Sequence, residues 1–309
     1  MQTHSQQPIA TRTISLIGVP LELGASQPGA RLGPSALREA GLASQIEQLG
    51  YRVVDRGDIR IDLRRTELTG GPGHPKHVAA IRDICSAVAD AVEEALRLDS
   101  FPVLLGGDHS LAIGALAGIA RVKGPQGIIW MDAHADLNTP GSSPSGNVHG
   151  MSMAAALGKM RDVFDERIFP SPSVDVRHSV FVGLRDLDPA ERNAIREQKI
   201  SSFTMTDIDR VGMAQVMQQA IAIAGPDQAS VHLSFDVDCL DPSLAPGTGT
   251  PVPGGLTYRE AHLAMELLAQ SGIAHSLELV EVNPALDQDN KTARLAAALI
   301  CSALGKSIL

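Results

Sequence analysis

The chain has 309 residues, a formal net charge of −9 at pH 7, and a composition that is 44% hydrophobic but only 3% aromatic. This length allows one large domain or two smaller ones, with a core built mainly from aliphatic side chains. The acidic balance and the lack of a basic tract argue against nucleic acid as a partner, and they are compatible with a cationic substrate.

The sequence also limits where the protein is expected to work. No run of 18 apolar residues is present, so we expect no transmembrane helix and no membrane partner. Residues 1–12 are polar and lack the apolar segment of a signal peptide, and we expect a flexible N-terminal tail there. Cys85, Cys239 and Cys301 form no spaced pair, which is typical of reduced thiols in a cytoplasmic protein.

Short apolar runs alternate with segments of helical periodicity from residue 13 onward. The apolar runs predict strands at residues 13–19, 52–58, 102–105, 127–131, 179–184, 200–203, 230–235 and 274–282. Helical spacing predicts helices at residues 34–49, 74–98, 111–122, 150–157, 189–197, 211–224, 257–271 and 291–304. The alternation predicts one α/β domain over residues 13–309, with an eight-stranded, mostly parallel sheet and helices on both faces.

Two acidic strings follow predicted strands. Asp132, His134 and Asp136 alternate along the first string, and Asp236 and Asp238 along the second. If each strand continues through its string, alternate side chains share one face. Four carboxylates cannot lie together unpaired, because like charges repel strongly in a low-dielectric site. A metal centre resolves this, and aspartate with imidazole but no thiolate favours a hard to borderline divalent ion such as manganese.

Polar residues follow four of the predicted strands. His109, Asp132, Asp236 and Glu281 each lie at or just after the carboxyl end of a strand. Ligands of open parallel sheets bind beyond these ends. The sequence therefore predicts a functional site at this edge of the sheet.

The segments that carry these residues resemble the signatures of the ureohydrolase superfamily, at residues 106–110, 132–136, 234–242 and 281–284. Four further segments resemble arginases in particular, at residues 138–140, 145–150, 184–191 and 249–252. The resemblance runs from about residue 13 to the C-terminus. It implies a three-layer αβα fold and an enzyme that hydrolyses L-arginine to L-ornithine and urea with two Mn²⁺ ions per subunit.

The resemblance also implies roles at the metal centre. One ion would be held by His109, Asp132, Asp136 and Asp236, and the other by Asp132, His134, Asp236 and Asp238. A hydroxide bridging the two ions would attack the guanidinium carbon. Glu281 would pair with the guanidinium, and Asp136 would carry the proton of the nucleophile to the leaving nitrogen.

His149 has two interpretations. It is either a proton shuttle, for which an ordinary pKa of about 6.5 is suitable, or a loop residue that caps the following helix. The resemblance to arginases favours the shuttle.

The polar loop at residues 137–148 is long enough to suggest a functional loop. By resemblance, Asn138, Ser143 and Ser145 would bind the α-carboxylate of the substrate. The same resemblance implies that Asp188 contacts the α-ammonium of the substrate and that Glu191 supports this contact. It also implies that Thr250 lines the guanidinium end of the site.

Two other functions stay open. The first is an agmatinase or another guanidino-acid ureohydrolase, and the second is an inactive metal-binding protein on the same fold. Asp209, Arg259 and Glu260 stand where arginases place salt bridges between subunits, which implies a homotrimer or homohexamer. Their alternative interpretation is solvated helix ends.

Overall fold

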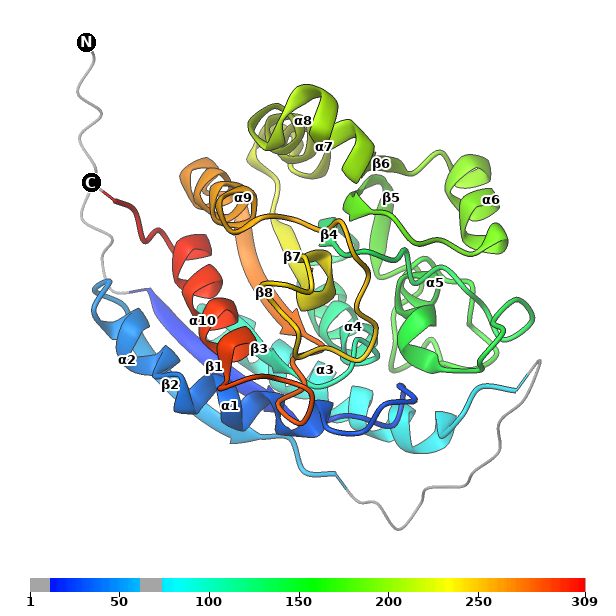
Figure 1. Ribbon diagram of the computed structural model, residues 1–309. Coiled ribbons are helices and arrows are strands. Elements are labelled where there is room, and N and C mark those ends of the chain that lie inside the picture. The colour runs from blue at the N-terminus through cyan, green and yellow to red at the C-terminus, as the bar shows by residue number, and fades with distance from the viewer. Residues whose placement is uncertain (1–11, 62–73, 309) are drawn as a thin grey trace.

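A single sheet of eight parallel strands forms the centre of the molecule (Figure 1). The computed structural model describes residues 12–61 and 74–308, so residues 1–11 of the expected tail lie outside the described residues. The strand order is β2-β1-β3-β8-β7-β4-β5-β6, and every pair of neighbours is parallel. The predicted fold class is therefore confirmed.

The strands follow the predicted positions closely. Their bounds are β1 Thr13–Val19, β2 Arg52–Asp58, β3 Ser100–Gly106, β4 Gln126–Met131, β5 Val174–Leu184, β6 Ser201–Thr204, β7 Val231–Asp236 and β8 Ala274–Val280. The α-helices of the described residues are α1 Gly33–Glu39, α2 Leu42–Glu47, α3 Val78–Arg97, α4 Leu111–Lys123, α5 Ser152–Ala156, α6 Pro189–Gln198, α7 Met205–Val211, α8 Met213–Ala224, α9 Tyr258–Ser271 and α10 Lys291–Ala303.

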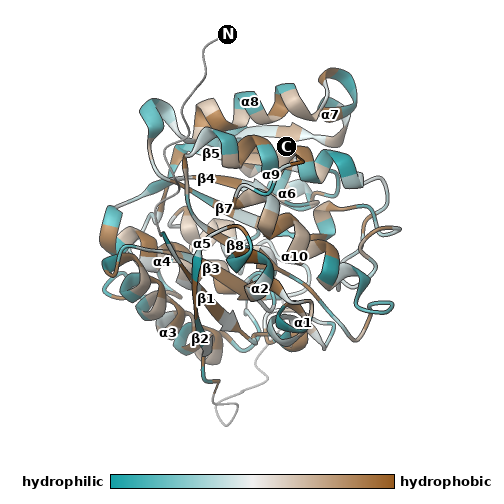
Figure 2. Ribbon diagram, turned by 90° about the vertical axis from the view of Figure 1, so that its left-hand side faces the viewer, coloured by the Kyte–Doolittle hydropathy of each residue, from teal (hydrophilic) through white to brown (hydrophobic). Residues whose placement is uncertain are grey.

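Each face of the sheet carries its own apolar core. Along β3, Val103 and Leu105 face one core and Leu104 faces the other, because successive side chains of a strand point to opposite faces. Helices α1, α2, α8, α9 and α10 pack on the first core, and α3, α4 and α5 on the second. In Figure 2 the central strands are brown and the helices are brown only in part, as expected for strands buried on both faces.

Two helix predictions were wrong in detail. The predicted helix at 34–49 is two helices, because Gly41 adopts a left-handed conformation with φ of 77° and starts a new helix. The predicted helix at 211–224 is preceded by α7, which the sequence analysis missed. Thr204 and Asp207 form a capping box at the start of α7, and this spacing is a signal visible in the sequence.

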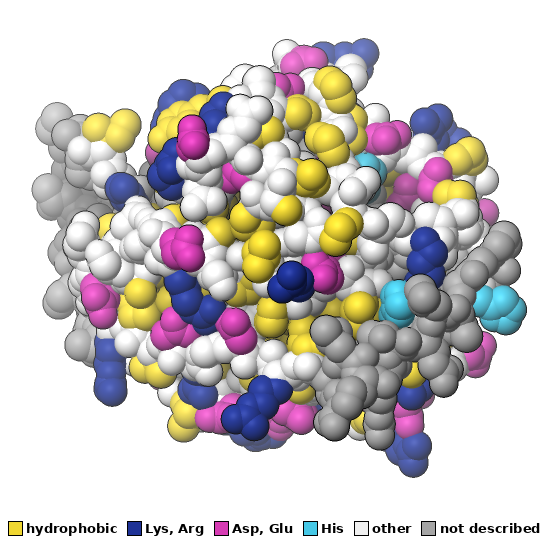
Figure 3. Space-filling view, turned by 60° about the horizontal axis from the view of Figure 1, so that its bottom comes forward, with side chains coloured by type: hydrophobic (Ala, Val, Ile, Leu, Met, Phe, Trp, Pro, Cys, Tyr) yellow, Lys and Arg dark blue, Asp and Glu magenta, His cyan; other side chains and the backbone are white. Residues whose placement is uncertain are grey.

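The surface is mixed in charge. On the face shown in Figure 3, Lys and Arg side chains are interspersed with Asp and Glu. None of the helices in the described residues is long and apolar enough to cross a membrane.

The strand order explains how distant residues meet. Strands β3, β8, β7 and β4 are neighbours at the centre of the sheet. Their carboxyl ends lead to His109, Glu281, Asp236 and Asp132, respectively. Parallel neighbours end at the same edge, so this edge collects the predicted site residues.

Candidate metal centre and substrate pocket

The first group of candidate ligands surrounds His109. Its Nδ1 atom lies 3.3 Å from Asp132 Oδ2, 3.1 Å from Asp136 Oδ2 and 3.1 Å from Asp236 Oδ2. All four side chains are buried. Neither His109 Nδ1 nor Asp136 Oδ2 has a hydrogen-bond partner, so both atoms are free to serve as ligands. This is the arrangement expected where a cation completes the site.

A second group lies beside the first and shares Asp132 with it. His134 Nδ1 lies 3.4 Å from Asp132 Oδ1 and 3.0 Å from Asp238 Oδ2. Asp132, His134 and Asp238 offer ligand atoms close enough to hold one metal ion, as do His109, Asp132 and Asp236. Two adjacent sites that share a carboxylate fit a binuclear centre.

The electrostatics of the cluster also favour a cation. Burial raises the pKa of Asp236 well above its usual range, and the nearby Asp238 and Asp132 raise it further. Burial and Asp132 likewise raise the pKa of Asp136 to about 6. Burial would lower the pKa of His109, but the surrounding carboxylates outweigh it and raise that pKa. The cluster therefore retains protons unless divalent cations replace them.

The backbone around these side chains is not extended, as the sequence had predicted, but turns after each strand. Strand β4 ends at Met131, and Asp136 lies in a loop with φ of 51°. Strand β7 ends at Asp236, and Asp238 belongs to a short 3₁₀ turn, Val237–Cys239, capped by the Asp236 side chain. The prediction of one extended strand through each string was wrong, because turns bring the carboxylates together.

Several buried neighbours of the ligands were missed in the sequence. The Trp130 ring stacks on His109 at a centroid distance of 4.1 Å, and its Nε1 donates to Asp132 Oδ2 over 2.9 Å. His109 Nε2 contacts Ser234 Oγ at 2.7 Å. Trp130 is the only tryptophan of the chain and lies two residues before Asp132, which was an available signal.

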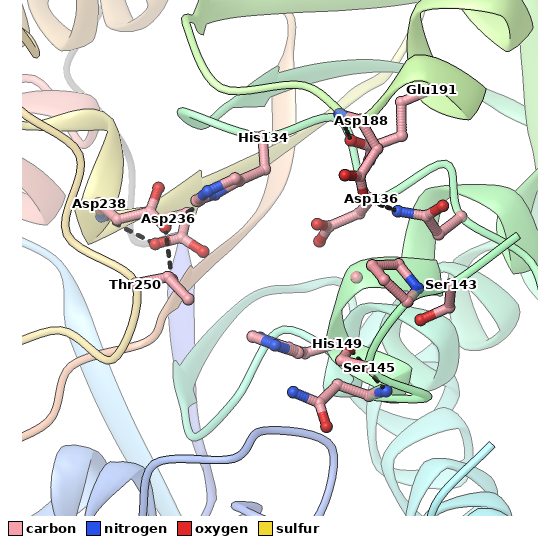
Figure 4. A pocket seen from close by; sticks show the side chains of 14 residues that line it. His134, Asp136, Ser143, Ser145, His149, Asp188, Glu191, Asp236, Asp238 and Thr250 are labelled. Atoms are coloured by element: carbon pink, nitrogen blue, oxygen red, sulfur yellow. Dashed lines mark hydrogen bonds and ion pairs between the residues drawn. The ribbon is translucent and has the colours of Figure 1, made fainter. Parts of the chain in front are cut away.

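A pocket of about 290 Å³ opens above the candidate ligands. In Figure 4, His134, Asp236, Asp238 and Thr250 gather on one side of it. Asp188, Glu191 and Ser143 lie on the other side, and His149 stands below them. The full lining is His134, Asp136, Asn138, Ser143, Pro144, Ser145, Asn147, His149, Gly150, Asp188, Glu191, Asp236, Asp238 and Thr250. The pocket thus contains every residue expected to bind substrate except Glu281.

Neutral donors occupy one wall of the pocket. Ser143 Oγ accepts a hydrogen bond from the backbone N–H of Gly146, and Ser145 Oγ accepts one from Asn147. Because each hydroxyl oxygen already accepts, its own hydrogen remains available to donate. Asn147 lines the same wall and was not singled out in the sequence.

Asp188 and Glu191 are held by the start of α6. Asn138 Nδ2 donates to Asp188 Oδ2 over 2.8 Å. The two oxygens of Glu191 accept the backbone N–H groups of Asp188 and Leu137. Burial raises the pKa of Glu191 to about 7. Glu191 therefore fixes the backbone that carries Asp188.

Glu281 lies beneath the pocket rather than in its lining. It is buried, with φ of 63°, and its Oε1 accepts from the backbone N–H of His109. His149 Nδ1 lies 2.9 Å from the same oxygen. Burial would lower the pKa of His149, but Glu281 outweighs it and raises this pKa to about 9. The contact with Glu281 therefore favours the protonated form of His149.

The candidate interface residues lie outside this pocket. Glu260 forms the capping box of α9 with Thr257, and Arg259 contacts Glu266 at 3.3 Å. Both therefore have partners within the chain, and their role between subunits stays a prediction.

Comparison with known proteins identifies the family. A model of the arginase family matches residues 12–305. The chain belongs to the arginase family. It is 46% identical to the arginase of Bacillus caldovelox over 298 residues, which is 96% of this chain and 100% of the relative.

Solved structures agree with this membership. The native structure of the Bacillus caldovelox arginase at pH 5.6 superposes with a TM-score of 0.92, covering 97% of this chain and 100% of the other. The crystal structure of Bacillus subtilis arginase gives 0.89 at 43% identity, covering 96% and 100%. A hypothetical agmatinase from Burkholderia thailandensis gives 0.73 at 29% identity, covering 95% and 85%. The fold is thus that of the arginase family.

Proposed function

We propose that this member of the arginase family hydrolyses L-arginine to L-ornithine and urea with two manganese ions. The observation that carries the proposal is the composition of the pocket. Its floor holds two adjacent groups of carboxylate and imidazole ligands, and its wall holds neutral donors at Asn138, Ser143 and Ser145. A substrate with a cationic guanidinium at one end and an α-carboxylate at the other matches both.

The ligand set fits the proposed ions. His109, Asp132, Asp136 and Asp236 would hold one ion, and Asp132, His134, Asp236 and Asp238 the other. The support is the pair of partnerless buried atoms, His109 Nδ1 and Asp136 Oδ2, together with oxygen-rich ligands that suit manganese. When bound, the two ions would acidify water and supply the nucleophile.

The pocket residues would orient the substrate. The free hydroxyl hydrogens of Ser143 and Ser145, with the Asn138 amide, would donate to the α-carboxylate. Asp188 would accept from the α-ammonium, and Glu191 would hold Asp188 in place through the backbone. Thr250 Oγ1 donates to Asp238 Oδ2 over 2.9 Å, so Thr250 would fix this carboxylate beside the guanidinium.

Two groups would move protons. Asp136 would carry the proton of the nucleophile to the leaving nitrogen, because a carboxylate that binds an ion through one oxygen keeps its second oxygen to accept a proton. With its pKa raised to about 9, His149 is protonated at neutral pH and can donate to the departing amine. Glu281 would maintain that charge through its contact with His149 and would pair with the guanidinium.

The runner-up activity, an agmatinase, is less well supported. Agmatine lacks the α-carboxylate, so the donors at Asn138, Ser143 and Ser145 would be left unpaired. An inactive metal-binding protein is also less well supported, because every candidate ligand is present and four of them, His134, Asp136, Asp236 and Asp238, line the pocket.

Urea release from L-arginine and from agmatine tests the proposal. After metal removal and reconstitution with manganese, we expect kcat/KM for L-arginine to exceed that for agmatine by at least about 10³-fold. Asp188→Ala should act mainly through KM, and Glu281→Ala should nearly abolish turnover of both guanidines. A higher kcat/KM for agmatine would refute the arginase assignment and leave the metal chemistry standing.

We also place the enzyme in the cytoplasm. The support is the state of the three cysteines, which are free and buried.

A further inference from the structure

A chain of polar side chains runs from His109 into the core between β7 and β8. His109 Nε2 lies 2.7 Å from Ser234 Oγ, and Ser234 Oγ donates to Glu278 Oε1 over 2.7 Å. Glu278 Oε2 lies 3.5 Å from His232 Nε2, and His232 Nδ1 lies 2.8 Å from Ser276 Oγ. All five side chains are buried.

The register of the sheet builds this chain. Ser234 pairs with Glu278 and His232 pairs with Ser276 across β7 and β8, so all four point to one face. Leu233, which lies between His232 and Ser234 along β7, is apolar and belongs to the core on the opposite face of the sheet. A buried carboxylate is costly unless it is paired, and the pocket does not use Glu278 directly. Glu278 is, however, connected through Ser234 to His109, so we expect its role at His109.

The direction of the hydrogen bonds supplies that role. A carboxylate only accepts, so the hydrogen between Ser234 and Glu278 is that of the Ser234 hydroxyl. The Ser234 oxygen then accepts from His109, which places the ring proton on Nε2. The lone pair of His109 Nδ1 is left facing the carboxylates of Asp132 and Asp236 at 3.3 and 3.1 Å.

We propose that Glu278 is a positioning residue of the metal centre, which acts through Ser234 to hold His109 with its proton on Nε2 and Nδ1 free to bind the ion. His232 Nε2 lies 3.5 Å from the second oxygen of Glu278, without a hydrogen bond between them. The inference rests on the binuclear site of the proposed function. A partner on the outer nitrogen fixes the orientation of a ligating imidazole and increases its basicity.

The other candidate imidazole has no such support. The His134 side chain is 24% exposed, and its Nε2 lies 3.9 Å from Asp186, which is 66% exposed. The two metal sites should therefore respond differently to a change at Glu278, and this difference makes the proposal testable.

The test is calorimetric titration of manganese into metal-free wild type and Glu278→Gln. Glutamine keeps the size of the side chain but removes its charge and can donate toward Ser234. We expect the affinity of the site that contains His109 to fall about 10- to 100-fold, while the site that contains His134 stays within about twofold. Equal affinities in both proteins, or equal weakening of both sites, would overturn the proposal.

Two controls assign the effect to His109. In a His109→Ala background, Glu278→Gln should have no further effect on manganese binding, because the hydrogen-bonded connection from Glu278 to the metal site is already lost. Asp186→Asn, beside the exposed imidazole, should leave the site that contains His109 unchanged. An undiminished effect of Glu278→Gln without His109 would show that Glu278 acts only on the packing of the core.

Wild-type protein gives an independent check if the variant does not fold. With ¹⁵N-labelled histidine and diamagnetic zinc at both sites, the nitrogen chemical shifts of His109 should report a proton on Nε2. A proton on Nδ1 would contradict the proposal. Wild type that takes up fewer than two ions would refute the proposed function, whereas two ions with an unaffected Glu278→Gln would refute only this inference.

Discussion

At the scale of single residues, Asp132 is the residue that connects the two candidate metal sites. Its Oδ2 lies beside His109 and its Oδ1 beside His134, and Trp130 Nε1 donates a hydrogen bond to Oδ2. Asp238, in contrast, belongs to the second group only. The loss of these two carboxylates should therefore have different consequences.

We predict that Asp132→Ala removes manganese from both sites and Asp238→Ala from one. The physical reason is the number of ions that each carboxylate would contact. The measurement is metal content by plasma mass spectrometry after manganese loading and gel filtration, with urea release on the same samples. Two tightly bound ions in Asp132→Ala, or full activity of a metal-free sample, would contradict the prediction.

His149 should shape the pH dependence of the rate. We expect the rate to rise from pH 7 to about 9 as water at the metal centre ionises. Glu281 raises the pKa of His149 above its ordinary value, so His149 stays protonated below about pH 9 and its donation is lost above that pH. The wild-type rate should therefore decline again at higher pH.

The variant His149→Asn isolates this contribution. We predict that turnover falls roughly 10-fold or more, that the decline above pH 9 disappears, and that bound manganese is unchanged. The kcat profile from pH 6 to 11, with metal content on the same samples, checks this. Unchanged turnover across a buffer series would show that His149 takes no part in the reaction.

At the scale of elements, a charged contact joins α1 to the edge strand β2. Arg38 Nε and Nη2 donate to the two oxygens of Asp55 at 2.8 and 2.9 Å, and Nη1 lies 2.6 Å from Asp58. These hydrogen bonds lower the pKa of Asp55. The carboxylate thus stabilises the fold above its unfolded pKa of about 3.9, and this stabilisation is lost as pH falls through the lower folded pKa.

We predict that Asp55→Asn lowers the free energy of unfolding by about 1 kcal/mol at pH 7, a figure kept small because solvent screens the pair. The difference from wild type should shrink below about pH 3. Urea unfolding at both pH values measures it. Glu94→Gln is the control, because that carboxylate is 63% exposed beside Arg56 and should contribute less than about 0.5 kcal/mol. A difference that grows on acidification would be inconsistent with the pairing.

At the scale of the whole molecule, assembly stays a prediction of the sequence. The resemblance to arginases places Asp209, Arg259 and Glu260 at contacts between subunits. We expect a homotrimer or homohexamer, because head-to-tail interfaces close into rings. Light scattering at micromolar concentration should give a mass about three or six times that of the 32.5 kDa chain. A mass near that of one chain would contradict the prediction, and Arg259→Glu should favour smaller species.

The sequence by itself predicted the strands of the sheet and the residue types of the candidate metal ligands. Apolar runs as long as β1 and β7 have few alternatives to a buried strand, so the strand positions were predictable from local composition. The acidic strings after β4 and β7 also implied a metal centre, since carboxylates so close together need cations.

Only the tertiary structure decided how these residues meet. The order β3-β8-β7-β4 brings His109 next to residues more than a hundred positions away, and pairing between distant strands has no signal in a local pattern. The turns at Asp136 and Asp238 depend on the packing around them. The contacts of Ser234 with Glu278 and of His232 with Ser276 likewise arise from strand register, which sets side chains opposite one another across the sheet.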